Sequence, residues 1–191
     1  MALPPGLILR AGTPGDAPLI QRVHEESIRG LGPRWYSRAE VESWAAGLKP
    51  QRYVQAMTQG DERFLLVEPE GGGGWLAAFC SFGTDRIDNL YVHPDWARRG
   101  VGEFLLARAE AAIRDAGHGS IRVIATLVGR PLYEKRGYRV LRQREYRSRG
   151  GLLLTVLDME KPTAAARGPG PRPGSPRRDG AAASAGPGDR R

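Results

Sequence analysis

The chain has 191 residues and a mass of 20.8 kDa, which is the size of one domain with room for a tail. Its 40% hydrophobic and 26% charged residues are typical of a globular protein, and 29 Lys and Arg against 21 Asp and Glu give a net charge of +8. The single cysteine, Cys80, excludes an internal disulfide and any cysteine-built zinc or iron–sulfur site, and we expect no metal.

The first third of the chain predicts one strand followed by helices. Residues 6–11 read as a strand, and Asp16 is a suitable N-cap for the helix that follows it. Ser37 and Glu40 have the spacing of a capping box, in which each side chain satisfies a free amide at the start of a second helix. Pro50 can begin a further short helix.

After residue 60 the hydrophobic period changes from helical to strand-like. The pattern predicts a hairpin, a third strand, a long helix, another strand, a short helix and a closing hairpin. These elements cover residues 63–68, 75–82, 86–93, 98–116, 120–127, 131–136, 138–147 and 152–160. The predicted order is β-α-α-β-β-β-α-β-α-β-β, which is a mixed α/β (α+β) domain with one long central helix.

The composition changes sharply after Lys161. Residues 162–191 contain no Ile, Leu, Val, Met or aromatic residue, and Gly, Pro, Ala and Arg dominate. Such a segment buries too little apolar surface to offset its conformational entropy, so we expect a folded domain over residues 1–161 and a disordered basic tail over 162–191. The tail is expected to be a solvated extension, with weak nucleic-acid contact as the alternative.

One segment carries most of the chemical information. It begins at Leu90 and reads Leu-Tyr-Val-His-Pro-Asp-Trp-Ala-Arg-Arg-Gly-Val-Gly, so a strand ends, a loop turns and a helix starts at Gly100-Val101-Gly102. The first amides of a helix have no intrahelical partners, and glycines let a ligand approach them. This pattern indicates a pyrophosphate site. A Rossmann motif is excluded because Leu105 replaces its third glycine, and a P-loop is excluded because Glu103 follows Gly102.

Two motifs and the element order together resemble the GNAT (GCN5-related) N-acetyltransferases. The first motif is the segment just described, and the second is Arg-Pro-Leu-Tyr-Glu-Lys-Arg-Gly-Tyr at residues 130–138. The resemblance covers about residues 7–161. Ala97 and Val128 depart from the family, which usually has Gln or Arg at the first position and Asn near the second. Residues 36–44, 87–88 and 147–151 resemble a small bacterial YafP-like branch.

The resemblance implies a mostly antiparallel sheet whose two central parallel strands splay apart to receive acetyl-CoA. The strands around residues 86–93 and 120–127 would form the two sides of this opening. One set of cofactor-binding residues would lie on the first of these strands, and the other at the start of the helix. These residues are Leu90, Tyr91, Val92, Arg98, Arg99, Gly100, Val101, Gly102 and Glu103.

Two residues are candidates for the chemical step. Tyr133 matches the tyrosine that serves as general acid in the family, and the alternative is an aromatic that only packs under the sheet. Asp88 alternates in phase with Leu90 and Val92, so we expect it to share their face of the strand. Its carboxylate would accept the amine proton or bind a cationic substrate, and the alternative is a solvated aspartate at a strand end.

Aromatic and histidine residues near the first two helices leave further possibilities. Trp35 and Tyr36 are open between an acceptor-binding wall and core packing, and we expect Trp44 to pack in the core. His24 and His118 are isolated in the sequence, so we expect both at the surface.

The leading hypothesis is a cytoplasmic N-acetyltransferase that moves an acetyl group from acetyl-CoA directly to a primary amine. The cytoplasmic location is expected because apolar runs are too short to span a membrane and the first ten residues lack a secretory pattern. The acceptor would be a small-molecule or peptide amine, and the protein a monomer or a homodimer. The alternative is an acyl-CoA-binding sensor without turnover, whose tail touches nucleic acid.

Overall fold

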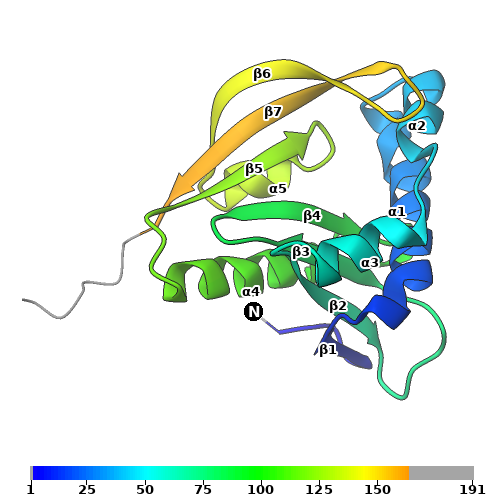
Figure 1. Ribbon diagram of the computed structural model, residues 1–191, viewed down its shortest axis with the longest axis vertical. Helices are drawn as coiled ribbons and strands as arrows, with labels where there is room; N and C mark the ends of the chain where they lie inside the picture. The colour runs from blue at the N-terminus through cyan, green and yellow to red at the C-terminus, as the bar shows by residue number, and fades with distance from the viewer. Residues whose placement is uncertain (1, 164–191) are drawn as a thin grey trace, which may run out of the picture.

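The computed structural model describes residues 2–163. Its strands are β1 (Leu7–Ala11), β2 (Arg63–Pro69), β3 (Ala78–Phe82), β4 (Arg86–Val92), β5 (Ser120–Thr126), β6 (Arg139–Arg147) and β7 (Leu153–Pro162). Its α-helices are α1 (Ala17–Leu31), α2 (Arg38–Ala45), α3 (Pro50–Thr58), α4 (Val101–Asp115) and α5 (Arg130–Lys135). The predicted order is confirmed, with α3 as the short third helix (Figure 1).

The strands form one seven-stranded sheet in the order β1-β2-β3-β4-β5-β7-β6. Every neighbouring pair is antiparallel except β4 and β5, which run parallel. That parallel pair is joined only at Arg86 with Arg122 and Ile87 with Val123. Beyond these residues the two strands diverge toward α1 and α2 (Figure 1), which confirms the expected splayed centre.

Helices cover both faces of the first half of the sheet. On one face, α4 presents Val101, Leu105, Ala109 and Ile113, all fully buried, to the strands. Their helical spacing forms the single apolar stripe that such packing requires. On the other face, apolar side chains of α1 and α3 pack with those of β2 and β3 in a second cluster; among them are Ile20, Val23, Tyr53, Phe64 and Phe79.

Two element boundaries differ from the prediction for local reasons. The helix α4 begins at Val101 rather than residue 98, because Arg98 and Gly100 adopt left-handed backbone angles, with φ of 59° and 84°. The return strand of the hairpin begins at Ala78 rather than residue 75. Trp75 precedes that strand and stacks on Trp96 with ring centroids 6.1 Å apart.

The last strand passes the predicted end of the domain by one residue. It ends at Pro162, after which the Thr163 amide donates to the Gly119 carbonyl at 2.9 Å. The predicted tail therefore lies almost wholly outside the described residues, and its disorder stays a prediction. Within residues 2–163, no helix combines the length and apolar character needed to cross a membrane.

Candidate functional site

A cavity of about 720 Å³ lies where β4 and β5 separate. Its walls come from β4, β5, the end of α1, the segment before α2, the start of α4 and α5. This volume is in the range of small-molecule and cofactor sites. The cavity exists because the parallel pair stops after two residues, so the facing backbone edges of both strands are left without each other as partners.

The start of α4 forms one end of the cavity. The first intrahelical bond runs from the Phe104 amide to the Gly100 carbonyl at 2.9 Å, so the preceding amides have no acceptor within the helix. A Cβ atom at Gly102 would lie 3.2 Å from Val92 Cγ2, so glycine is what lets the helix start lie against β4. Bare amides at a helix start are suited to a phosphate group.

Basic side chains add positive charge at this end. Arg98 and Lys135 both line the cavity. The Lys135 ammonium donates to Glu103 Oε2 at 2.6 Å, which ties α5 to α4. This hydrogen bond lowers the pKa of Glu103, so the carboxylate stays charged and paired. Arg98 makes no ion pair with any residue among 2–163 and is available to an anion.

Most of the residues expected to bind the cofactor lie around this one cavity. Those that line it are Leu90, Tyr91, Val92, Arg98, Gly100, Gly102 and Glu103. Arg99 and Val101 do not line it. The Arg99 guanidinium lies over the Trp96 ring, 5.1 Å from its centroid, and the Val101 side chain is buried in the core against the sheet. Because the Val101 side chain is buried, only the backbone of that residue is open to a ligand.

Tyr133 lies on α5 and reaches the cavity from the α4 face of the sheet. It is 5% exposed, and its ring meets Tyr138 edge-on with centroids 5.2 Å apart. Burial raises the pKa of its phenol well above the ordinary value of 10.0, so the hydroxyl holds its proton at neutral pH. The side chain therefore both packs in the core and presents a proton donor to the cavity wall.

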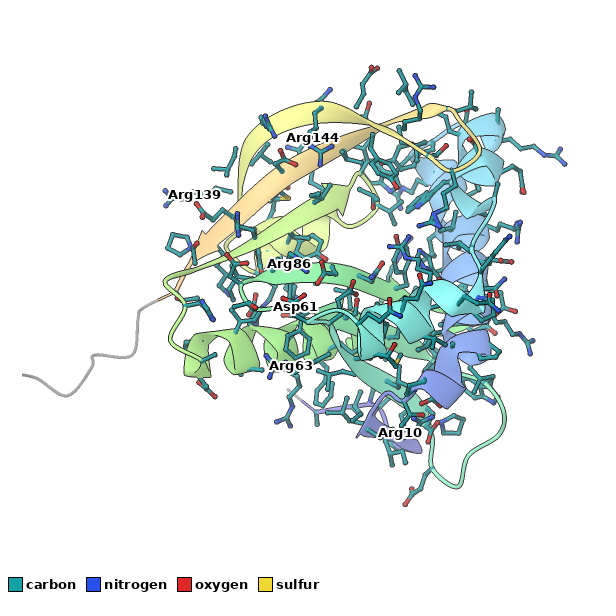
Figure 2. The ribbon with its side chains drawn as sticks, in the orientation of Figure 1. Arg10, Asp61, Arg63, Arg86, Arg139 and Arg144 are labelled. Atoms are coloured by element: carbon teal, nitrogen blue, oxygen red, sulfur yellow. The ribbon has the colours of Figure 1, made fainter. Side chains whose placement is uncertain are left out.

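Asp88 also lines the cavity, and it is not a solvated aspartate at a strand end. It is the extra residue of a β-bulge, because Ile87 pairs with Phe82 and Asn89 with Ser81. Its Oδ1 accepts from Arg86 Nε at 2.7 Å, and Arg86 Nη2 donates to Asp61 Oδ1 at 2.9 Å (Figure 2).

The second oxygen of Asp88, Oδ2, is closed off from solvent and has no partner among residues 2–163. Burial raises the pKa of this carboxyl, while the hydrogen bond and charge of Arg86 oppose the rise. The group is thus held in an anionic pair, with one oxygen whose hydrogen-bonding capacity is unused.

The aromatic residues near α1 and α2 differ in whether they line the cavity or make structural contacts. Trp35 and Trp44 line the cavity, and Trp35 is 42% exposed. Tyr36 does not line it. The Tyr36 hydroxyl donates to the Thr155 carbonyl at 2.7 Å and accepts from the Leu127 amide at 2.9 Å, so it links β7 to the end of β5. Trp44 packs against the core as expected and also lines the cavity, whereas Tyr36 has a structural contact.

The surface position expected for His24 is wrong. It is 3% exposed, its Nδ1 lies 2.8 Å from the Tyr53 hydroxyl, and its ring centroid is 3.7 Å from that of Tyr91. The apolar side of α1 carries it inward because Ile20, Val23 and Ile28 share that face. Burial lowers the pKa of His24, so the ring is neutral. The neutral ring packs against the ring of Tyr91, which lines the cavity.

Several residues of the cavity wall were not expected from the sequence. Among them are Ser27, Asn89, Ile124 and Lys135. Lys135 belongs to the second motif, at residues 130–138, so its place in the cavity wall could have been predicted from the sequence. The others carry no local signal, since their position depends on strand pairing and on how α1 packs against the sheet. Within residues 2–163, no three His, Cys, Asp or Glu side chains gather as metal ligands would.

Comparisons with known proteins give the family and the fold. A family model described as an acetyltransferase (GNAT) domain matches residues 34–161. Among curated proteins, the N-acetyltransferase YafP of Escherichia coli K12 is 22% identical over 154 residues, which span 81% of this chain and 95% of the relative.

Solved structures share the fold. A GCN5-related N-acetyltransferase from Rhodopseudomonas palustris superposes with a TM-score of 0.74 and 28% identity, over 85% of this chain and 99% of that one. The PaiA N-acetyltransferase from Thermoplasma acidophilum, solved in complex with coenzyme A, superposes with a TM-score of 0.63 and 21% identity, over 82% and 99% of the two chains.

Proposed function

The chain belongs to the GNAT acetyltransferase family, and from that premise we propose that it moves an acetyl group from acetyl-CoA to a primary amine by direct transfer. The resemblance to this family stated from the sequence is confirmed, and YafP is among the relatives found. The observation that carries the proposal is the opening between β4 and β5, which runs into the bare amides at the start of α4.

Acetyl-CoA fits this opening in two parts. The pantetheine arm contains amides, so it can pair with the free backbone edge at Leu90, Tyr91 and Val92 as a strand would. The pyrophosphate suits the amides of residues 99–103 and the charge of Arg98. The thioester would then lie toward the joined ends of β4 and β5, near Asp88 and Tyr133.

The transfer requires a neutral amine to attack the thioester carbonyl. The new C–N bond forms as the C–S bond breaks, the amine gives up a proton, and the departing sulfur gains one. We assign the donor of that second proton to Tyr133, whose phenol is protonated at neutral pH. We assign Asp88 as the acceptor of the amine proton, which requires its closed-off oxygen to open toward the cavity when the acceptor binds.

A thiol-release assay with acetyl-CoA and a panel of amines tests this function. We expect release with one class of amine, and we expect Tyr133→Phe to lower kcat about a hundredfold or more while acetyl-CoA still binds. Tyr138→Phe is the matched control, since this neighbouring buried tyrosine lies outside the cavity wall. Equal rates in wild type and Tyr133→Phe would remove Tyr133 from the mechanism.

Coenzyme A binding without thiol release from any amine would contradict the enzyme and support a sensor without turnover. The remaining parts of the proposal are a cytoplasmic location, a small-molecule or peptide acceptor, and a monomer or homodimer. Nucleic-acid contact through the tail would rest on residues outside the described part of the chain.

A further inference from the structure

Three polar side chains form a buried hydrogen-bond chain that ends at the cavity. Asn89 and Ser81 face each other across β4 and β3, and Asn89 Nδ2 lies 2.7 Å from Ser81 Oγ. Ser81 Oγ lies 2.9 Å from Glu62 Oε2. Ser81 is fully buried and Asn89 is 7% exposed. Polar groups this deep need a defined partner, so the chain has a fixed arrangement.

The charge on Glu62 sets the direction of every hydrogen bond in this chain. Burial raises the pKa of Glu62, and the hydrogen bond from Ser81 opposes that rise. In its ionised form the carboxylate only accepts, so the Ser81 hydroxyl donates its single proton to Glu62. The Ser81 oxygen is then left to accept, and Asn89 must offer its NH₂ group to it. The carbonyl end of the Asn89 amide, Oδ1, is thereby turned away from Ser81.

Asn89 Oδ1 has no hydrogen-bond partner among residues 2–163, and it is not among the polar atoms closed off from solvent. Asn89 lines the cavity, so an oriented acceptor oxygen faces a site where no protein group uses it. An amide oxygen left without a protein partner at the cavity wall can accept a hydrogen bond from a ligand.

This oxygen lies on the face of the sheet that α1 and α3 cover. Asn89 alternates with Tyr91, which packs against the clusters of α1, α2 and α3. Leu90 and Val92 instead pack against the α4 core, which also holds Tyr133. Acetyl-CoA held along the α4 side and an amine substrate held beside Asn89 would therefore meet through the opening between β4 and β5.

The rest of this side of the cavity is largely apolar or aromatic. Ile28, Leu31, Trp35, Trp44, Tyr91 and Ile124 contribute to the wall. The other polar side chains on this part of the wall are Ser27, which is 5% exposed, Arg34 and Thr126. A ligand that donates one N–H at the sheet and fills the remaining space with apolar surface matches this lining.

We propose that Asn89 Oδ1 accepts an N–H of the acceptor amine, and that Ser81 and Glu62 are positioning residues that aim this oxygen. The acceptor is then a primary amine on an apolar or aromatic body. The inference rests on the proposed acetyl transfer and adds the group that holds the amine for attack.

Steady-state kinetics with the best amine from the panel test the role of Asn89. Asn89→Leu keeps the size but removes both polar atoms, so we expect the KM for the amine to rise about tenfold while the KM for acetyl-CoA stays unchanged. Asn89→Asp keeps an acceptor oxygen, so we expect it to retain amine binding. Ser148→Ala is the control, because it removes a buried hydroxyl that bonds Ser43 outside the cavity.

A double variant tests the positioning role. Ser81→Ala alone frees the Asn89 amide to turn over, so we expect the KM for the amine to rise. In the Asn89→Asp background, both oxygens of the side chain at position 89 can accept a hydrogen bond, so it no longer matters which one faces the amine. Ser81→Ala should then have little further effect on the KM for the amine. Equal effects of Ser81→Ala in both backgrounds would show a merely structural role for this serine.

The outcomes separate this inference from the proposed function. Thiol release by the wild type, with an unchanged amine KM in Asn89→Leu, would overturn the inference and leave the enzyme standing. A rise of both KM values together would overturn it as well, because it would indicate general damage. No release by the wild type with any amine would overturn both.

Discussion

The roles proposed for Tyr133 and Asp88, which line one cavity, require the first to hold a proton and the second to be free of one. Burial raises the pKa of both groups. For a tyrosine proposed to donate, the rise keeps the phenol protonated at neutral pH. For a carboxylate proposed to accept the amine proton, a higher pKa is unfavourable, because the group is then protonated over a wider pH range. Arg86 counteracts it through a hydrogen bond at 2.7 Å, so Arg86 sets how acidic the solution can be before Asp88 is protonated.

Arg86→Met is therefore expected to move the pH profile. Without the hydrogen bond and positive charge of Arg86, less opposes the effect of burial, so the pKa of Asp88 rises further. Since the base works only when deprotonated, the acidic limb of kcat/KM should shift to higher pH, as measured by thiol release across pH.

Arg122→Met is the matched control for this profile. Arg122 is the register partner of Arg86 on β5, but it pairs with Asp85 rather than Asp88. Its loss should leave the acidic limb in place. A limb that moves equally in both variants would indicate a general loss of positive charge rather than a specific effect on Asp88.

At the scale of single residues, the sequence identified residues that belong to contiguous motifs, but it did not predict contacts that depend on sheet pairing. Tyr133 and the glycines of the helix start were found because each belongs to a contiguous motif. The alternation argument for Asp88 does not hold across the bulge, since Ile87 and Leu90 both pack on the α4 core despite their spacing. Asn89 was missed because its role depends on Ser81 and Glu62, which only sheet pairing brings near it.

The element that most directly shapes the site is the turn into α4. Gly100 is the N-cap residue of this helix and has a φ of 84°, a left-handed conformation that costs an L-residue about 1–2 kcal/mol. The sequence pattern predicted a helix from residue 98, whereas α4 begins at Val101. The glycine instead forces a turn that leaves the following amides pointing into the cavity.

Gly100→Ala should weaken acetyl-CoA binding about tenfold. The added Cβ meets no neighbouring atom, so the cost comes from backbone conformation and not from a clash. If the turn relaxes, the amides of residues 101–103 move away from the pyrophosphate. Calorimetric titration with acetyl-CoA measures the loss.

Gly119→Ala provides the control for this titration. Gly119 also has open space around it but does not have a left-handed φ, so a Cβ there should leave the affinity unchanged. Equal affinity in wild type and Gly100→Ala would mean that the turn tolerates a side chain and that its conformation does not set the affinity.

At the scale of the whole molecule, the two halves of the sheet are packed differently. Strands β1 to β4 lie between α4 on one face and α1 and α3 on the other. Strands β5, β7 and β6 have less cover: Ile124 is 57% exposed and Leu141 62% exposed, and Arg139 and Arg144 lie along β6 (Figure 2). We infer that resistance to unfolding is concentrated in the first half, including the ion cluster that joins β1, α1 and β2.

That cluster makes stability depend on pH. Arg10 donates to both oxygens of Asp16, at 2.7 and 2.9 Å, and also to Glu68 at 2.8 Å. The hydrogen bond from Arg10, opposed by burial and aided by Thr13, lowers the pKa of Asp16 from 3.8 to about 2. A depressed folded-state pKa stabilises the protein above the unfolded value, here by about 2 kcal/mol, and the effect is lost as pH falls from about 4 to about 2.

Asp16→Asn should therefore lower the free energy of unfolding by about 2 kcal/mol at pH 7, and the gap to the wild type should close as the pH falls from about 4 to about 2. Urea denaturation at several pH values measures it. Glu42→Gln is the control, because the pair of Glu42 with Arg29 is largely exposed and should contribute under about 1 kcal/mol. A gap for Asp16→Asn that stays constant with pH would mean that packing, and not the charge of Asp16, holds this corner of the sheet together.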